Sequence, residues 1–135
     1  MQTPAPAGPA VIAHDVVVVG GGLVGASLAI ALARIGVDVA LVEATGAGTL
    51  PAVFDQRNLS FAEATVNALE ALGVMPLLRM PAAPIRRIHV SRRGDFGRVL
   101  LDAGEYGRDC FGQVVVASDF GAAAAARGPR GRIRR

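Results

Sequence analysis

Val16-Val17-Val18-Val19-Gly20-Gly21-Gly22-Leu23-Val24-Gly25 is the stretch of sequence that decides the fold. Four consecutive valines are typical of a strand that is buried on both faces, as in a parallel sheet. The glycines that follow have the spacing G-x-G-x-x-G, which marks a dinucleotide-binding turn when a strand precedes it and a helix follows. We therefore expect a strand, a tight turn and the start of a helix, in that order.

The residues that follow complete a βαβ unit. Small and apolar residues continue at helical spacing to about Ile35, and Gly36 stands where the cap that ends a helix is expected. A second strand is expected over Val37–Val42, with Glu43 at its C-terminal end. Glu43 comes 18 residues after Gly25, where a carboxylate can accept hydrogen bonds from ribose hydroxyls. It also repels a 2′-phosphate, which disfavours NADP and leaves FAD and NAD open.

Each glycine of the fingerprint has its own physical role. Gly20 permits the tight turn, Gly22 lets a pyrophosphate approach the backbone, and Gly25 lets the helix pack closely against the strand. The backbone N–H groups of Leu23 and Val24 are then expected to face the phosphates from the helix N-terminus. The alternative is a glycine-rich turn that only packs a βαβ unit.

Composition and charge narrow the class of protein. The chain has 135 residues, of which 52% are hydrophobic and 4% aromatic, and this suits an α/β domain with small residues between helix and sheet. All 14 basic residues are arginine, and five of them lie in the last nine positions, whereas residues 1–126 carry nine arginines and eleven acidic residues. The basic tail has no aromatic residue for stacking on bases, so we expect no nucleic-acid partner.

The cysteine count, the uncharged stretch and the histidines bear on the cellular compartment, on membrane insertion and on metal binding. The single cysteine, Cys110, excludes an internal disulfide and favours a reducing, cytoplasmic location. Residues 16–33 are uncharged, but three glycines after four β-branched residues disfavour a continuous helix, so we expect no transmembrane segment. Peripheral membrane association is kept as an alternative. His14, His89 and Cys110 lack the spacing of metal ligands, and no metal site is expected.

Further elements are predicted downstream. Ser60-Phe61-Ala62-Glu63 has the form of a capping box and predicts a helix that ends near Leu72. Strands are expected over Ile85–Ser91, Arg98–Leu101 and Gln113–Val116, the first two joined by a turn at residues 92–95. Asp119 is expected to cap a helix that runs through Ala126.

A resemblance to a known family rests on six stretches: Gly20–Glu43, Phe54-Asp55-Gln56-Arg57, Thr65–Val74, Pro84–Ser91, Gly94–Gly97 and Phe111–Val115. Together they resemble the flavin-dependent aromatic-ring hydroxylases of ubiquinone biosynthesis, of the 2-polyprenyl-6-methoxyphenol hydroxylase type. The resemblance covers about residues 14–121. Its F-D-x-R and I-x-V-S…G-x-F-G stretches are more specific than the glycine fingerprint, which many flavoproteins share.

The resemblance implies FAD rather than NAD as the cofactor. Carried over by position, Glu43 would hold the ribose and Arg57 would lie near the phosphate or ribitol of the flavin, while no catalytic residue is carried over. In that family NAD(P)H reduces the flavin, and the enzyme hydroxylates a polyprenylated phenol. The alternative interpretation is a small, non-catalytic module that binds an adenine dinucleotide, either FAD or NAD.

Length separates this chain from that family, whose members run to several hundred residues. The family's second and third flavin motifs have no counterpart in the sequence. We therefore expect an incomplete α/β fold: a Rossmann-like βαβ FAD-binding unit with the first strands of a substrate domain. It would be the N-terminal portion of an FAD-dependent monooxygenase, not competent alone, and a truncated or frame-shifted product.

Four segments follow from this interpretation. They are a disordered N-terminus at 1–13, the FAD-binding βαβ unit and helix at 14–80, the start of the substrate-domain β region at 81–121, and a disordered Ala/Arg-rich tail at 122–135. The substrate, the ring position and the oligomeric state are left open.

Overall fold

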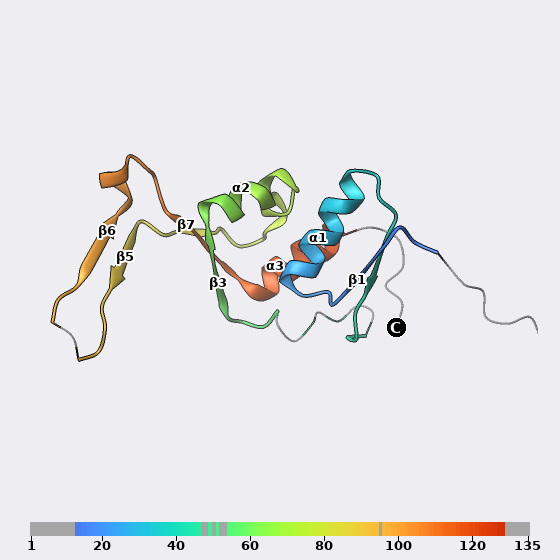
Figure 1. Cartoon of the computed structure of the whole chain (residues 1–135), viewed down its shortest axis with the longest axis horizontal. Helices are drawn as coiled ribbons and strands as arrows, with labels where there is room; N and C mark the ends of the chain where they lie inside the picture. The colour runs from blue at the N-terminus through green and yellow to red at the C-terminus, as the bar shows by residue number, and fades with distance from the viewer. Residues whose placement is uncertain (1–12, 47–48, 50, 52–53, 95, 129–135) are drawn as a thin grey trace, which may run out of the picture.

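The computed structural model describes residues 13–46, 49, 51, 54–94 and 96–128. The elements follow in the order β1 (Val16–Val19), α1 (Leu23–Arg34), β2 (Val39–Val42), β3 (Asn58–Ala62), α2 (Glu63–Ala71), the 3₁₀ helix η1 (Met75–Leu77), β4 (Ala83–Pro84), β5 (Arg87–Val90), β6 (Val99–Asp102), the 3₁₀ helix η2 (Ala103–Tyr106), β7 (Gly112–Val116) and α3 (Ala117–Arg127). This mixed α/β architecture confirms the predicted fold class (Figure 1). The disorder expected at 1–12 and 129–135 concerns residues outside the described ranges.

β1, α1 and β2 form the predicted βαβ unit. β1 and β2 are parallel neighbours, with Val16 opposite Val39 and Val19 opposite Val42. Gly36, two residues after α1, has φ +84°, a left-handed conformation that glycine adopts without strain and that ends the helix as expected.

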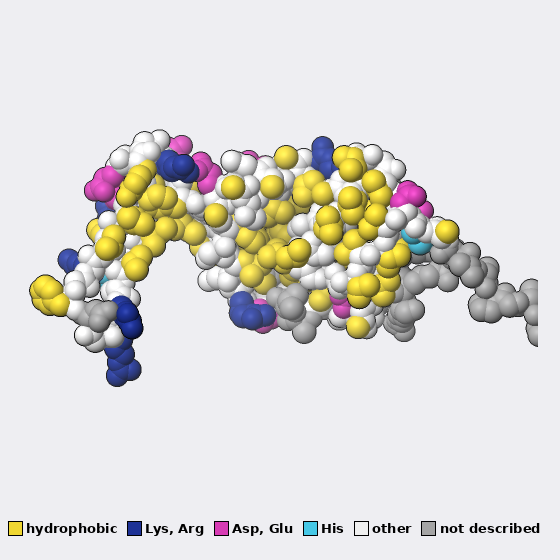
Figure 2. All heavy atoms as spheres, viewed as in Figure 1, with side chains coloured by type: hydrophobic (Ala, Val, Ile, Leu, Met, Phe, Trp, Pro, Cys, Tyr) yellow, Lys and Arg dark blue, Asp and Glu magenta, His cyan; other side chains and the backbone are white. Residues whose placement is uncertain are grey.

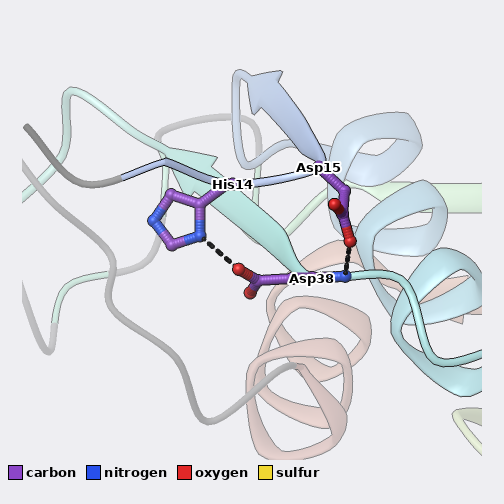
Figure 3. Close-up of polar contacts among 3 residues, drawn as sticks. All are labelled: His14, Asp15 and Asp38. Carbon is purple, nitrogen blue, oxygen red and sulfur yellow. Dashed lines mark hydrogen bonds and ion pairs between the residues drawn. The ribbon is translucent and has the colours of Figure 1, made fainter.

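The starting ends of the two strands are tied together by side chains (Figure 3). Nδ1 of His14 lies 3.0 Å from Oδ2 of Asp38, and the backbone amide of Asp38 donates to Oδ2 of Asp15 at 3.0 Å. These contacts join the segment before β1 to the segment before β2. They hold the end of the unit that lies opposite the glycine turn.

The valine strand is less buried than its composition predicts. Val18 is buried with Ala29 and Val39, but Val17 and Val19 are 56% and 81% exposed. Among the described strands β1 has a single neighbour, β2, and a strand buried on both faces needs neighbours and helices on both sides. The expectation of burial on both faces is therefore wrong for this chain.

β7 is the central strand of an antiparallel sheet with the order β3-β7-β4. β3 pairs with it from Asn58–Val116 to Ala62–Gly112. Gly112 is needed here, because a Cβ atom at this position would collide with the carbonyl oxygen of Phe61. The sheet joins segments on both sides of the division that was predicted between residues 80 and 81.

The predicted capping box is wrong, because Ser60 lies inside β3. α2 begins at Glu63, and its N-cap residue, Ala62, makes no side-chain hydrogen bond. Glu63 forms an ion pair with Arg108, and its backbone amide donates to the carbonyl oxygen of Phe111 at 3.0 Å. Strand pairing with β7 thus takes the place of the local cap.

The C-terminal end of α2 is a point where three helices meet. Val66 and Leu69 are the buried residues of α2. Arg34 of α1 donates to the carbonyl oxygen of Ala71, and Arg127 of α3 donates to that of Leu72. Guanidinium groups at this position complement the partial negative charge of a helix C-terminus.

α3 corrects two expectations. Its N-cap residue is Val116, and Asp119 lies in its first turn, where the carboxylate accepts hydrogen bonds from the backbone amides of Arg79 and Met80. Residues 122–127 belong to the helix, which confirms the expected helix through Ala126 and shows that the expectation of disorder is wrong for these residues. Two of their alanines, Ala123 and Ala124, are buried, because small side chains let α3 lie against α1.

The main hydrophobic core forms where α2, α3 and the three-stranded sheet meet. Phe120 is fully buried at its centre, with ring centroids 5.5 Å from Phe61 and 6.0 Å from Phe54. Ile30 of α1 also joins this core, which links the βαβ unit to the remainder of the chain.

β5 and β6 form the predicted hairpin, which extends away from the rest of the molecule (Figure 1). Residues directly opposite each other share a face, so one face carries Ile88, Val90, Val99 and Leu101. Figure 2 shows hydrophobic side chains gathered along this arm.

Candidate dinucleotide-binding site

The turn between β1 and α1 requires glycine at two positions. Gly20 has φ +98°, and its amide donates to the carbonyl oxygen of Val42 at 2.8 Å, which extends the pairing of the two strands. A Cβ atom at Gly25 would collide with the carbonyl oxygen of Gly20. The turn predicted from the glycine spacing is thus present, with α1 seated directly against it.

The first turn of α1 presents backbone amides with no competing side chain. Its N-cap residue, Gly22, has extended geometry, and neither a side-chain cap nor an acidic residue occupies the first turn. The amide of Ala26 makes the first bond of the helical ladder, to Gly22 at 2.9 Å. The preceding amides, which include those of Leu23 and Val24, have no partner within the helix. Such a helix N-terminus is suited to bind an anion.

Glu43 is held on two sides at the end of β2. Oε2 accepts a hydrogen bond from the backbone amide of Gly21 at 2.6 Å. Oε1 accepts from the amide of Thr45 at 2.9 Å and from its hydroxyl at 3.0 Å. The Thr45 amide, then the Gly21 amide and the Thr45 hydroxyl, hold the pKa of Glu43 below its usual range. The half-buried carboxylate is therefore ionised at neutral pH.

These residues fit the adenosine and pyrophosphate end of a dinucleotide. The first amides of α1, which have no partner within the helix, and the helix dipole favour the phosphates, and the glycine turn leaves room for their approach. The ionised Glu43 can accept hydrogen bonds from a ribose and disfavours a 2′-phosphate. This geometry alone does not distinguish FAD from NAD, because the two share this end.

The contacts that orient Arg57 are made with its neighbour Asp55 and not with the glycine turn. Its backbone amide donates to Oδ1 of Asp55 at 2.8 Å, and its Nε lies 2.8 Å from Oδ2. Within the described residues it makes no hydrogen bond or ion pair with Gly20–Gly25 or Glu43. Its side chain is 67% exposed. The role predicted for Arg57 at the cofactor stays a prediction.

Phe54 gives the F-D-x-R stretch its anchor. The ring is buried against α3, and a Cβ atom at Gly121 would lie 2.6 Å from its Cγ atom. The carbonyl oxygens of Asp55 and Arg57 accept hydrogen bonds from Ser118 and Ala117 at 2.8 Å each. The motif is thereby fixed to the start of α3, while its charged side chains face outward.

Two residues of the site, Gly21 and Thr45, do not follow from the sequence motif. The fingerprint spacing gives Gly21 no role, yet its amide donates to Glu43, and a Cβ atom there would lie 3.0 Å from Oε2. Thr45 lies outside the motif, although Ser and Thr near a chain reversal often bind local polar groups. That signal could have identified Thr45 as a partner of Glu43.

Metal sites, membrane-spanning helices and pockets are the other features that bear on function. The described part of the chain contains no cluster of three or more His, Cys, Asp or Glu side chains that could hold a metal. None of the helices within the described ranges is long and apolar enough to cross a bilayer. A groove of about 420 Å³ runs beside α2 and η1 and includes Glu70, Met75, Leu78 and Gln113 in its lining. It contains none of the predicted site residues.

Comparisons with known proteins agree with this geometry. A family model described as "FAD binding domain" matches residues 13–134. The crystal structure of p-nitrophenol 4-monooxygenase PnpA from Pseudomonas putida DLL-E4 is similar, with a TM-score of 0.64 and 23% identity over 84% of this chain and 29% of that one. RebC-10x, in native and K252c-bound form, has a TM-score of 0.56 and 20% identity over 87% and 24%. The chain thus spans less than a third of either protein, and the likeness shows a shared fold.

Proposed function

The chain belongs to the FAD binding domain family, and from this membership we propose that it holds the adenosine and pyrophosphate end of FAD in a flavin-dependent monooxygenase. The observation that carries the proposal is the hydrogen bond from the Gly21 amide to Glu43, which holds this carboxylate beside the glycine turn. Membership in this family favours FAD over NAD, as the sequence resemblance implies.

Each part of the site has a stated task in this proposal. Gly20 and Gly25 shape the turn, and the amides of Leu23 and Val24 receive the pyrophosphate. Glu43 accepts the ribose hydroxyls and disfavours a 2′-phosphate. When FAD is bound, its ring system supplies the redox and oxygen chemistry. The contribution of the described residues is binding and orientation.

The whole protein's reaction is a further part of the proposal. The resemblance in Pro84–Ser91 and Gly94–Gly97 supports hydroxylation of a polyprenylated phenol, with NAD(P)H as the reductant. PnpA is named for another phenol, p-nitrophenol. We therefore place the substrate among phenols and favour one with a polyprenyl chain. A cytoplasmic location, which rests on the single Cys110, completes the proposal.

Titration of the purified chain with FAD tests the binding function. We expect FAD to raise the melting temperature, since a ligand at 100 times its Kd adds about 2.7 kcal/mol to the free energy of unfolding. FMN, which lacks the adenosine end, is expected to have no effect. Absence of a shift at saturating FAD would overturn the proposal. Equal binding of NAD and FAD would favour the alternative, a non-catalytic module for adenine dinucleotides.

A further inference from the structure

Thr45 donates two of the three hydrogen bonds found between described residues and the Glu43 carboxylate. It lies two residues beyond Glu43 and gives two hydrogen bonds to Oε1, at 2.9 Å from its amide and at 3.0 Å from its hydroxyl. Gly21 gives the third bond, to Oε2, from the opposite side. We propose that Thr45 is a positioning residue for the cofactor ribose and a determinant of selectivity against a 2′-phosphate; this inference rests on the proposed FAD-binding function.

The hydrogen-bond capacity of the carboxylate supports this role. Each carboxylate oxygen has two acceptor sites. Thr45 uses both sites of Oε1, whereas Gly21 uses one site of Oε2. One acceptor site therefore remains on Oε2, the carboxylate oxygen that lies next to the glycine turn. The two bonds from Thr45 therefore present Oε2, rather than Oε1, to a ribose hydroxyl.

Selectivity follows from the same restraint. Glu43 lies between the glycine turn and its own loop, and even a methyl group at Gly21 would come within 3.0 Å of Oε2. A carboxylate that could rotate outward would tolerate a neighbouring phosphate, because the separation of the two negative charges would increase. With the hydroxyl of Thr45 in place, the negative charge stays beside the ribose. Thr45 thus strengthens the repulsion of a 2′-phosphate.

Two substitutions at position 45 separate the hydroxyl from the backbone amide. Thr45→Val removes the hydroxyl and keeps the amide and the branched shape, whereas Thr45→Ser keeps the hydroxyl. Thr49→Val is a matched control in the same loop, because Thr49 is exposed and its side chain makes no hydrogen bond to a described residue. Thr45→Ala provides a second hydroxyl-free variant if the valine is poorly tolerated.

The measurements are the Kd values of FAD, ADP-ribose and ADP-ribose 2′-phosphate by calorimetry, with a thermal melt of each ligand-free variant. We expect Thr45→Val to weaken the binding of FAD and ADP-ribose by up to about tenfold, because the less restrained Glu43 side chain must be immobilised when the ligand binds. Its preference for ADP-ribose over the 2′-phosphate should fall several-fold. Thr45→Ser and Thr49→Val should keep the wild-type affinities and the wild-type preference for ADP-ribose over its 2′-phosphate. A residue that only stabilised the loop would change the melt and leave this preference unaltered.

Two outcomes overturn the inference in different ways. If the wild-type chain binds FAD and Thr45→Val keeps both its affinity and its preference, the inference alone is wrong. If the wild-type chain binds neither FAD nor ADP-ribose, the proposed function fails and the inference fails with it.

Discussion

The backbone amide of Gly21 donates a 2.6 Å hydrogen bond to Oε2 of Glu43, and this bond joins the glycine turn to the end of β2. The two residues are 22 positions apart in the sequence. Parallel pairing of β1 with β2 brings them together, because it places the C-terminal ends of both strands at one edge. The fold therefore places the two parts of the proposed site, the glycine turn for the phosphates and Glu43 for the ribose, next to each other.

The first prediction concerns the charge of Glu43. Glu43→Gln keeps the shape of the side chain but removes the charge that strengthens its hydrogen bonds. We expect the Kd of FAD to rise about tenfold or more in calorimetric titration. Glu105→Gln, an exposed change in η2, serves as the control and should leave the Kd unchanged. An unaltered Kd in Glu43→Gln would contradict the assignment of this residue to the ribose.

The second prediction is a dependence of stability on acid pH. The folded-state pKa of Glu43 lies below its unfolded value because of the amides of Thr45 and Gly21. Such a group stabilises the fold above its unfolded pKa, about 4.3, and this contribution is lost as the pH falls through the folded pKa. The melting temperature of the wild-type chain should therefore drop on acidification.

Asp55 and Asp102 contribute in the same direction. The pKa of Asp55 is lowered chiefly by the backbone amide of Arg57, and that of Asp102 by the side chain of Arg87. Glu43→Gln should consequently reduce the acid sensitivity without abolishing it. Thermal melts of both proteins over the acid range measure the difference, and parallel curves would show that the Glu43 bonds add no stability.

The third prediction concerns close packing at the start of α1. Gly25→Ala places a methyl group against the carbonyl oxygen of Gly20, so the helix must move away from the turn. We expect a loss of about 1–3 kcal/mol in the free energy of unfolding and the loss of FAD binding. Gly128→Ala is the control, because a Cβ atom there makes ordinary contacts at 3.4 and 3.6 Å. Denaturant unfolding of the two variants should differ clearly.

Local patterns explain how much of the fold was predictable. The βαβ unit and the β5–β6 hairpin are encoded by neighbouring residues: a glycine turn, helical spacing, and a turn at Gly94. β3 was missed because its partner lies far away in the sequence, with Asn58 opposite Val116. Ser60 and Glu63 satisfy a local rule for a cap, and only the distant strand overrides it.

The residues of the candidate site also divide into those that local sequence spacing predicts and those that it does not. The fingerprint glycines and Glu43 were predictable because their spacing is set by one strand, one turn and one helix. Gly21 and Thr45 contribute through hydrogen bonds whose partner depends on where the carboxylate points, which spacing does not specify. The exposure of Val17 and Val19 could not be predicted either, because it depends on which strands flank β1.

The fourth prediction compares two phenylalanines. Phe120 of α3 is fully buried between Phe54 and Phe61, whereas Phe96 is fully exposed at the tip of the hairpin. Phe120→Ala should cost about 3–5 kcal/mol of stability, since it leaves a cavity in the core. Phe96→Ala should change stability by less than about 0.5 kcal/mol. Similar melting temperatures for the two variants would show that α3 does not pack as described.

The last prediction concerns the exposed face of the β5–β6 hairpin. Val90 and Val99 lie opposite each other on its apolar face and are 53% and 56% exposed. Exposed apolar surface favours association between molecules, and among the described strands β5 and β6 pair only with each other. The double change Val90→Thr with Val99→Thr keeps the β-branched shape and the strand preference while it adds two hydroxyls. We expect less light scattering at high protein concentration and an unchanged melting temperature.

Leu100→Thr is the matched control, because Leu100 shares the other face with Arg87, His89 and Asp102. Equal scattering by the double variant and the wild-type chain would exclude this face as the site of association.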